Sequence, residues 1–226
     1  IPLLFIIGFA GGMVGGLAVG VLKAKFQISE VIAAIMLNYI FRLFTSFLAS
    51  GPFTSGETSV QTVKLDPSLN LTTLVKNSKL TTAFFLALLV ALVLYVYLWK
   101  TTSGFKLRAT GLNASGALAS GINSKGYMLL TMVLCGGLAG LAGSAEVLGN
   151  YHRFIEGFSP SYGFTGIAVA ILGRNHPFGV ILTSFLFATL SSGALRMARV
   201  TNVSSNVIAV IQSLIIIAVA APEMIR

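Results

Sequence analysis

The feature that most constrains this chain is a succession of long apolar runs that carry almost no charge. A helix rises about 1.5 Å per residue, so about 20 apolar residues cross the hydrocarbon core of a bilayer. Runs of this kind occupy residues 1–22, 30–49, 80–99, 127–148, 177–195 and 207–221, with a shorter one at 162–173. Their only charged side chains are Glu30, Arg42 and Glu146. The pattern predicts a protein that crosses a membrane several times.

Helices are the only structures that fit these runs. Backbone N–H groups in lipid must be paired within the protein, and barrel strands alternate in polarity, which these runs do not. We therefore expect an all-α, polytopic transmembrane helical bundle with about six to seven membrane segments, forming a single domain over 1–226. Ile1 already lies inside an apolar run, so we expect further N-terminal segments. The stretch 162–173 is either a half-helix or is completed by the residues before it.

Composition excludes several other classes of protein. Only 9% of the residues are charged, against about 25% in soluble domains. The net charge is +9, but the basic residues lie between apolar runs instead of on one polar face, so nucleic acid is not an expected partner. The single cysteine, Cys135, excludes an intrachain disulfide and a cysteine-based metal site.

The distribution of basic residues between the loops predicts the orientation of the chain. If 162–173 counts as one crossing, one set of loops carries eight Lys or Arg residues and the other set carries six. The positive-inside rule places the more basic set in the cytoplasm. This set includes 100–126. The segment 50–79 is then external, either as a contact surface for another protein or as a disordered linker.

Small residues at four-residue spacing mark two helix faces. Gly12, Gly16 and Gly20 recur along the first run, and Gly136 and Gly140 do so in 127–148. Such residues let helices approach closely in lipid. We expect these glycines to serve helix packing, within one subunit or between two.

Two polar residues share a face of the second run. Asn38 and Arg42 are four residues apart, and Asn38 lies near the middle of the membrane. Polar groups at that depth usually face inward. Asn38 either lines a cavity or makes a hydrogen bond between helices, and Arg42 either lines the same path or extends toward the outer interface.

The segment 100–126 has the signals of a short helix outside the membrane. Asn113 is a good N-cap, Ala114–Ser120 can form two turns, and Gly121 can end them. Gly111 permits a sharp bend before this helix. Such an element can insert into a groove on a partner protein, and the alternative is an ordinary loop between two membrane helices.

Three blocks carry a resemblance to a known family. The stretch Gly104–Ile122 resembles the cytoplasmic "G…RA.G.N..A…GI" motif of ATP-binding-cassette (ABC) importer permeases. It is most similar to the branch that serves simple sugars, nucleosides and branched-chain amino acids. The blocks Ser29–Ile40 and Gly163–Pro177 resemble the nucleoside and simple-sugar permeases in particular.

This resemblance implies a permease subunit of the bacterial cytoplasmic membrane that translocates nucleosides or simple sugars. It implies a second permease subunit, ATP-binding subunits on the cytoplasmic face and a substrate-binding protein outside, with ATP bound by partner subunits and no cofactor or metal on this chain. The candidates for coupling to the ATPase are Leu107, Arg108, Ala109, Gly111, Asn113, Ala117 and Gly121. The candidates for the translocation path are Asn38, Phe164, Thr165 and Gly166.

The sequence itself argues against other functions. It contains no G-x-x-x-x-G-K-[ST] loop, so ATP hydrolysis must come from elsewhere and the chain is not expected to be an enzyme. A transporter driven by an ion gradient usually has ionisable groups in mid-membrane, and no run contains an Asp. An intramembrane hydrolase would need a nucleophile with a base, yet both histidines lie in predicted loops. A branched-chain amino acid permease is the alternative within the same branch.

Overall fold

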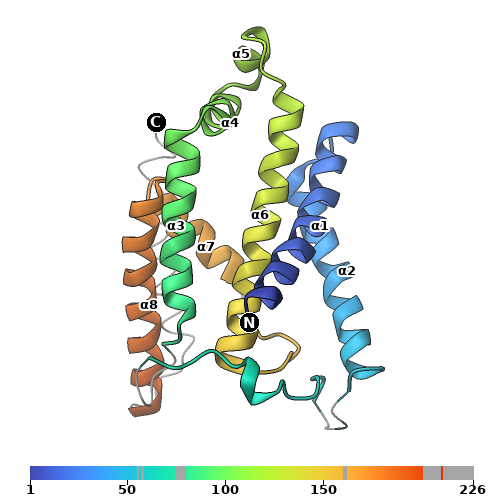
Figure 1. Ribbon diagram of the computed structural model, residues 1–226, viewed down its shortest axis with the longest axis vertical. Helices are drawn as coiled ribbons and strands as arrows, with labels where there is room; N and C mark the ends of the chain where they lie inside the picture. The colour runs from blue at the N-terminus through green and yellow to red at the C-terminus, as the bar shows by residue number, and fades with distance from the viewer. Residues whose placement is uncertain (55, 57–58, 75–79, 160–161, 201–209, 211–226) are drawn as a thin grey trace. The chain divides into compact units, whose positions relative to one another are not determined.

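The computed structural model describes residues 1–54, 56, 59–74, 80–159, 162–200 and 210, which are mainly helical and include no strand beyond isolated bridges. Figure 1 shows the order of the elements along the chain. They are α1 (Pro2–Phe26), α2 (Glu30–Ser50), η1 (Pro67–Leu69), α3 (Ala83–Lys100), α4 (Thr102–Leu112), α5 (Ala114–Ala119), α6 (Ser124–Glu146), η2 (Val147–Tyr151), α7 (Tyr162–Leu172) and α8 (Pro177–Val200). The predicted all-α fold class is confirmed.

Several of these helices have the length and composition of membrane spans. α1, α2, α3 and the continuous stretch Ser124–Tyr151 are long and apolar enough to cross a bilayer. Tyr162–Leu172 and Pro177–Gly193 are shorter apolar helices. These elements fit the predicted count of membrane segments, while the predicted run 207–221 lies, except for Val210, outside the described residues.

Two local features differ from the sequence prediction. The region 100–112 is not a loop: α4 fills it, because the Thr101 hydroxyl accepts a hydrogen bond from the Gly104 N–H at 3.0 Å and starts a new helix directly after α3. In addition, α6 passes into one turn of π-helix at Val147–Tyr151, which ends at His152 in the left-handed conformation. Single π turns of this kind have no clear signal in the pattern of apolar residues.

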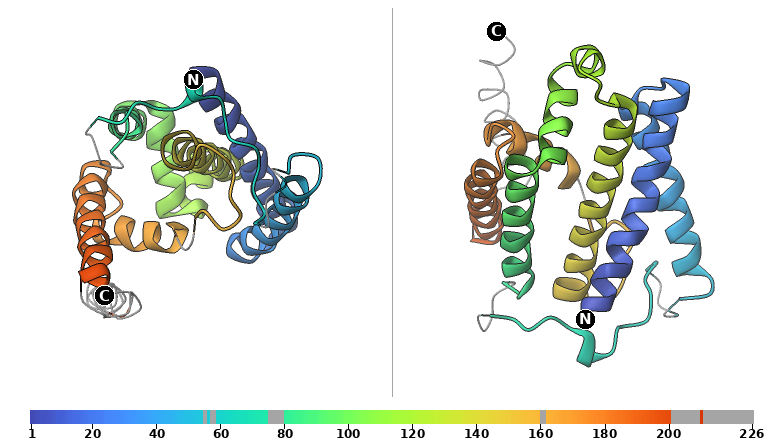
Figure 2. Two further views of the ribbon diagram at one scale, coloured as in Figure 1. Left: turned by 90° about the horizontal axis from the view of Figure 1, so that it is seen from below. Right: turned by 45° about the horizontal axis from the view of Figure 1, so that its top comes forward.

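The chain divides into two compact units. Unit 1 contains Ile1–Ala87 and Val96–Phe158, and unit 2 contains Leu88–Tyr95 and Ser159–Arg226. In unit 1, α1 lies along α6 (Figure 2). The contact runs through glycines. A Cβ added to Gly136 would lie 2.8 Å from the Cα of Gly16, and one added to Gly12 would lie 3.0 Å from the Cα of Gly140.

The predicted packing glycines therefore lie together in one subunit. Gly12 and Gly16 face Gly136 and Gly140, and a Cβ at Gly20 would meet the side chain of Leu129 at 2.8 Å. The two backbones are close enough that no side chain fits between them. This is the small-residue type of helix packing that lipid favours, because close van der Waals contact replaces the hydrophobic effect as the main attraction.

Unit 2 is organised by the contact between α7 and α8. Ala168, Val169 and Phe187 form its buried core, and Leu172 and Val180 pack against them. The Thr183 hydroxyl donates to the carbonyl oxygen of Val169 at 3.0 Å and so ties α8 to α7. Between the helices, Arg174 and Asn175 both adopt positive φ values of 53°, which makes the tight turn that reverses the chain.

Candidate functional site

The first candidate site is the end of unit 1 formed by α4 and α5. Figure 1 shows these two helices at one end of α6, whereas segment 59–74 lies at the other end. The Thr101 hydroxyl also donates to the carbonyl oxygen of Tyr97 at 2.6 Å, so a single side chain links the last turn of α3 to the first turn of α4. Gly104 is required at this elbow because a Cβ there would lie 2.7 Å from the Cα of Leu98.

Aromatic side chains of α3 hold α4 in place. The Tyr97 hydroxyl lies 3.0 Å from the Ser103 hydroxyl, and the Arg108 guanidinium carbon lies 5.0 Å from the centre of the Trp99 ring. A cation over an indole face is an attractive contact. These pairs could not be predicted from the sequence, because they depend on the helical form of 102–112.

The short helix α5 has the caps that the sequence predicts. Asn113 Oδ1 accepts a hydrogen bond from the Gly116 N–H at 2.9 Å, and Gly121, with a φ of 77°, follows the C-cap residue Ser120. The Ser124 hydroxyl donates to the carbonyl oxygen of Ala114 at 2.8 Å and ties α5 to the start of α6. The six-residue helix is therefore fixed at both ends.

The predicted position of the bend before α5 is wrong. Gly111 lies within α4, and the chain turns two residues later, at Asn113, whose φ of −154° and ψ of 101° are extended. The Asn113 side chain stabilises this break because it replaces a backbone partner for the first turn of α5. Gly111 instead lies at an open position on the surface of α4, since a Cβ there would contact nothing within 4 Å.

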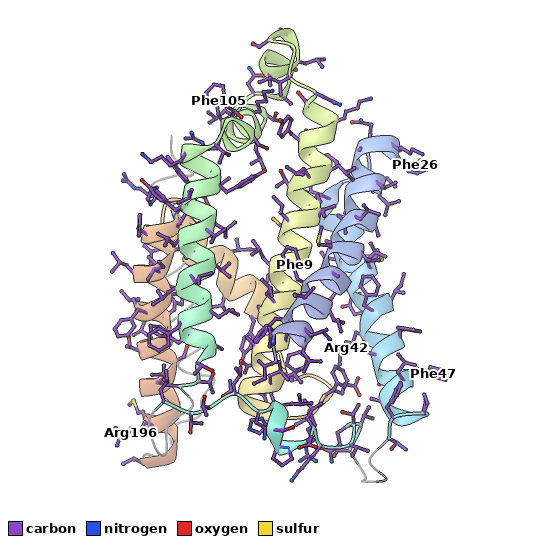
Figure 3. The ribbon with its side chains drawn as sticks, in the orientation of Figure 1. Phe9, Phe26, Arg42, Phe47, Phe105 and Arg196 are labelled. Atoms are coloured by element: carbon purple, nitrogen blue, oxygen red, sulfur yellow. The ribbon has the colours of Figure 1, made fainter. Side chains whose placement is uncertain are left out.

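The predicted coupling residues divide into supporting and exposed positions. Ala117 is 5% exposed and packs inward, and Leu107, Arg108 and Ala109 are half-buried. The most accessible apolar side chains at this end were missed by sequence analysis. They are Leu112, Leu118 and Phe105, which are 90%, 65% and 60% exposed, and Figure 3 shows Phe105 at this end of the chain.

These three side chains, Phe105, Leu112 and Leu118, form what we call the apolar tip. Leu112 ends α4, and Leu118 lies on α5, which the caps hold rigid. Exposed large apolar groups on a fixed, short helix are a suitable shape for a hydrophobic groove on another protein.

Prediction for the α5 cap. Replacing Asn113 by Ala removes the acceptor for the Gly116 N–H, and we expect a loss of about 1 kcal/mol of local helix stability. Faster amide hydrogen exchange at residues 114–119 measures the loss. Ser115→Ala is the control, since Ser115 is exposed on the same helix and has no capping role. Equal exchange in the two variants would contradict the capping role.

The second candidate site concerns the predicted translocation path. Asn38 lies on α2 in unit 1, its side chain is exposed in this chain, and within the described residues its amide has no hydrogen bond. Phe164, Thr165 and Gly166 lie on α7 in unit 2. Phe164 is 74% exposed and points away from the core of its unit.

Thr165 and Gly166 belong to an open groove between α7 and α8. The groove has a volume of about 360 Å³, and its wall on α8 includes Ser184, Phe187 and Ser191. Its other lining residues are Tyr162, Val169, Val180 and Ala188. The α8 hydroxyls were missed by sequence analysis, because only the packing of two helices shows which α8 face meets Thr165. The groove contains no charged side chain, so its chemistry suits a neutral solute that has both hydroxyls and an apolar face.

The third candidate surface is formed by the segments predicted to be external. Residues 60–65 pair with residues 152–156: the Thr62 N–H donates to the carbonyl oxygen of Phe154 at 3.0 Å, and the Leu65 N–H donates to that of His152 at 2.8 Å. Gln61, opposite Ile155, is only 4% exposed. We call these two paired stretches the outer platform. Within the described part of 50–79, residues 60–65 are thus paired with a second segment of the chain.

One carboxyl group beside the outer platform has a shifted pKa. The Ser68 backbone N–H donates to Asp66 Oδ1 at 3.0 Å, so that the Asp66 side chain caps η1, and this hydrogen bond lowers the pKa of the Asp66 carboxyl. Among the described residues, no group of three or more His, Cys, Asp or Glu side chains could hold a metal ion.

Comparison with known proteins identifies the family. Residues 1–220 match the family described as "Branched-chain amino acid transport system / permease component". The whole chain is 35% identical to a guanosine ABC transporter permease of Bacillus subtilis (NupP), and 34% identical to a nucleoside ABC transporter permease of Lactococcus lactis (NupB). It is 29% identical to a glucose ABC transporter permease of Haloferax volcanii (TsgB13).

The match covers only part of these relatives. The chain spans 66%, 65% and 62% of their respective lengths. No solved structure gives a significant match. The family match and the apolar helices together confirm the resemblance seen in the sequence and the placement in the cell membrane as a multi-pass protein. The chain therefore belongs to the permease-component family of ABC transporters typified by branched-chain amino acid transport systems.

Proposed function

We propose that this chain is the permease subunit of an ATP-driven importer that translocates nucleosides, with simple sugars as the next class of substrate. The observation that carries the proposal is the apolar tip on its capped and tethered helices, in a chain of this family. The relatives named for guanosine and nucleosides are more similar to the chain than the one named for glucose, which favours nucleosides.

In this proposal the region 100–126 faces the cytoplasm and couples the chain to ATP-binding subunits. Leu112 and Leu118 insert into a groove on the ATPase, while Asn113, Ala117 and Gly121 hold α5 in position. Arg108 transmits the movement to α3 through its contact with Trp99, and the Tyr97–Ser103 contact joins the same two helices. Leu107 and Ala109 flank Arg108 on α4. Gly111 leaves room for the partner beside α4. ATP is bound and hydrolysed by the partner subunits, and this chain needs no cofactor.

The outer platform is the proposed contact surface for an external substrate-binding protein, and a second permease subunit completes the path. Asn38, Thr165 and Gly166 line this path, with Phe164 available to stack on a base or sugar ring. Ser184 and Ser191 on α8 extend the polar lining. The groove is mainly apolar with a few hydroxyls, which suits weak binding and fast release.

The experiment that tests the proposal is substrate competition. Uptake of a labelled nucleoside by vesicles that contain the whole importer should be reduced by other nucleosides, less by simple sugars, and not by branched-chain amino acids. If leucine or valine competes and nucleosides do not, the chain serves the amino acid branch of its family instead.

Prediction for the groove. Replacing Ser191 by Ala removes one hydroxyl from the groove, and we expect the KM of nucleoside uptake to rise roughly two- to ten-fold, the range for one lost hydrogen bond. The amount of assembled importer should not change. Ser192→Ala is the matched control, because Ser192 is exposed and does not line the groove. Equal KM values for the two variants would remove the α7–α8 groove from the path.

A further inference from the structure

Glu156, an acidic residue of the outer platform, contacts two residues of the membrane helix α2. Glu156 Oε1 lies 3.8 Å from Arg42 Nε, and the Ser46 hydroxyl donates to Glu156 Oε2 at 3.2 Å. Arg42 and Ser46 are four residues apart on α2, so one carboxylate contacts two successive turns of that helix. Arg42 lies eight residues before the end of α2 at Ser50, about 12 Å along the helix axis. The contact therefore involves residues about one and two turns before the end of the helix.

The segment that carries Glu156 is held by hydrogen bonds and ring contacts. The Glu156 N–H donates to the carbonyl oxygen of Val60 at 3.1 Å, and the Phe154 N–H donates to the Thr62 hydroxyl at 3.1 Å. The ring of Phe158 lies 6.0 Å from that of Tyr151 and 5.8 Å from that of Phe154. A movement of the outer platform would therefore carry Glu156 with it.

The contact between Glu156 and α2 is, in contrast, easily broken. Arg42 is 61% exposed and Glu156 is 34% exposed, and a separation of 3.8 Å is an ion pair without a close hydrogen bond. Partly exposed ion pairs contribute little stability. Such a pair does not fix α2 permanently, and either side chain can exchange its partner at little cost in free energy.

We propose that Arg42, Ser46 and Glu156 form an outer latch that favours the resting position of α2 until the external substrate-binding protein docks on the outer platform. Docking moves the platform, Glu156 leaves α2, and α2, which carries Asn38 one turn from Arg42, becomes free to move and to change the access to Asn38 from outside. Arg42 and Glu156 are thus positioning residues that control access to the path. This inference rests on the proposed function for the path itself, but the latch can be tested without transport.

The test measures access to Asn38 in the assembled importer. In a Cys135→Ala background, Asn38→Cys is labelled with a membrane-impermeant thiol reagent from the outside, without a substrate-binding protein. We expect Arg42→Glu or Glu156→Arg to increase the labelling rate roughly two- to five-fold, the factor that corresponds to an exposed ion pair. The exchange of both residues in one protein should restore the original rate, because the attraction is re-formed with its sign reversed.

Lys64→Glu is the matched control, since it makes a similar charge change at an exposed position of the same platform. It should leave the labelling rate unchanged. Arg42→Gln and Glu156→Gln give the same test where a charge reversal reduces the amount of protein. Unchanged rates in the single variants, or an increase that the double exchange does not reverse, would overturn the latch. Absence of ATP-driven uptake by the importer that keeps Asn38 and Cys135, with the labelling pattern intact in the variants, would instead overturn the proposed function.

Discussion

Replacing Gly136 by Ala is expected to separate α1 from α6 and to lower the free energy of unfolding by about 1–3 kcal/mol, the usual cost of overpacking. The added Cβ would lie 2.8 Å from the Cα of Gly16 and closer still to the carbonyl oxygen of Gly12. Both are backbone atoms, which cannot rotate away as a side chain can. Gly12→Ala should act in the same direction, because its Cβ would meet the backbone of Gly136.

The same helices provide controls of opposite sign. A Cβ at Gly11 or at Gly143 would meet nothing within 4 Å. Since Ala is a better helix former than Gly, Gly11→Ala and Gly143→Ala should be neutral or stabilising by up to about 1 kcal/mol. Thermal unfolding of the four purified variants measures the difference. If Gly136→Ala and Gly143→Ala unfold alike, the close contact between α1 and α6 is not what holds unit 1 together.

The second large effect is expected at the apolar tip. Replacing Leu118 by Asp places a charge where a hydrophobic groove would have to bury it, and we expect ATP-driven uptake to fall at least about tenfold because a buried unpaired charge is costly. Since Leu118 is 65% exposed, the fold of this chain should be unaffected. Retention of ATPase subunits during purification of the importer measures the contact directly.

Controls separate docking from folding at this end. Ser115→Asp introduces the same charge on α5 at another exposed position, and it should retain more of the ATPase than Leu118→Asp does. Cysteine at Ser115 should react with an impermeant reagent only from the cytoplasmic side. Full uptake by Leu118→Asp would contradict the docking of the tip, and labelling of the cysteine from outside would contradict the orientation.

Features determined by a few neighbouring residues could be predicted from the sequence. The membrane helices follow from apolar runs. The caps of α5 follow from the Asn113 side chain, which accepts a hydrogen bond from the helix, and from Gly121, which adopts a positive φ because it has no Cβ. The packing glycines could be located because a four-residue spacing defines a face of any helix. What the sequence could not provide was their partner, since Gly12 and Gly136 are brought together only by the fold.

Features that depend on distant residues escaped sequence analysis. Arg42 was identified as a polar residue in α2, but its partner Glu156 lies in a segment more than 100 residues away. Ser184 and Ser191 looked like ordinary residues of an apolar helix until α8 was placed against α7. The bend expected at Gly111 was wrong for a different reason: glycine permits a bend, but the cap at Asn113 decided where the helix ended.

The measurement that most directly tests the account is the energy source of uptake. The importer should be reconstituted in vesicles with its ATP-binding subunits and substrate-binding protein, and nucleoside uptake followed with and without ATP. We predict uptake that requires ATP hydrolysis, persists when ionophores remove all ion gradients, and stops when the ATP-binding subunits are omitted. Uptake that is driven by an ion gradient through this chain without those subunits would contradict the account.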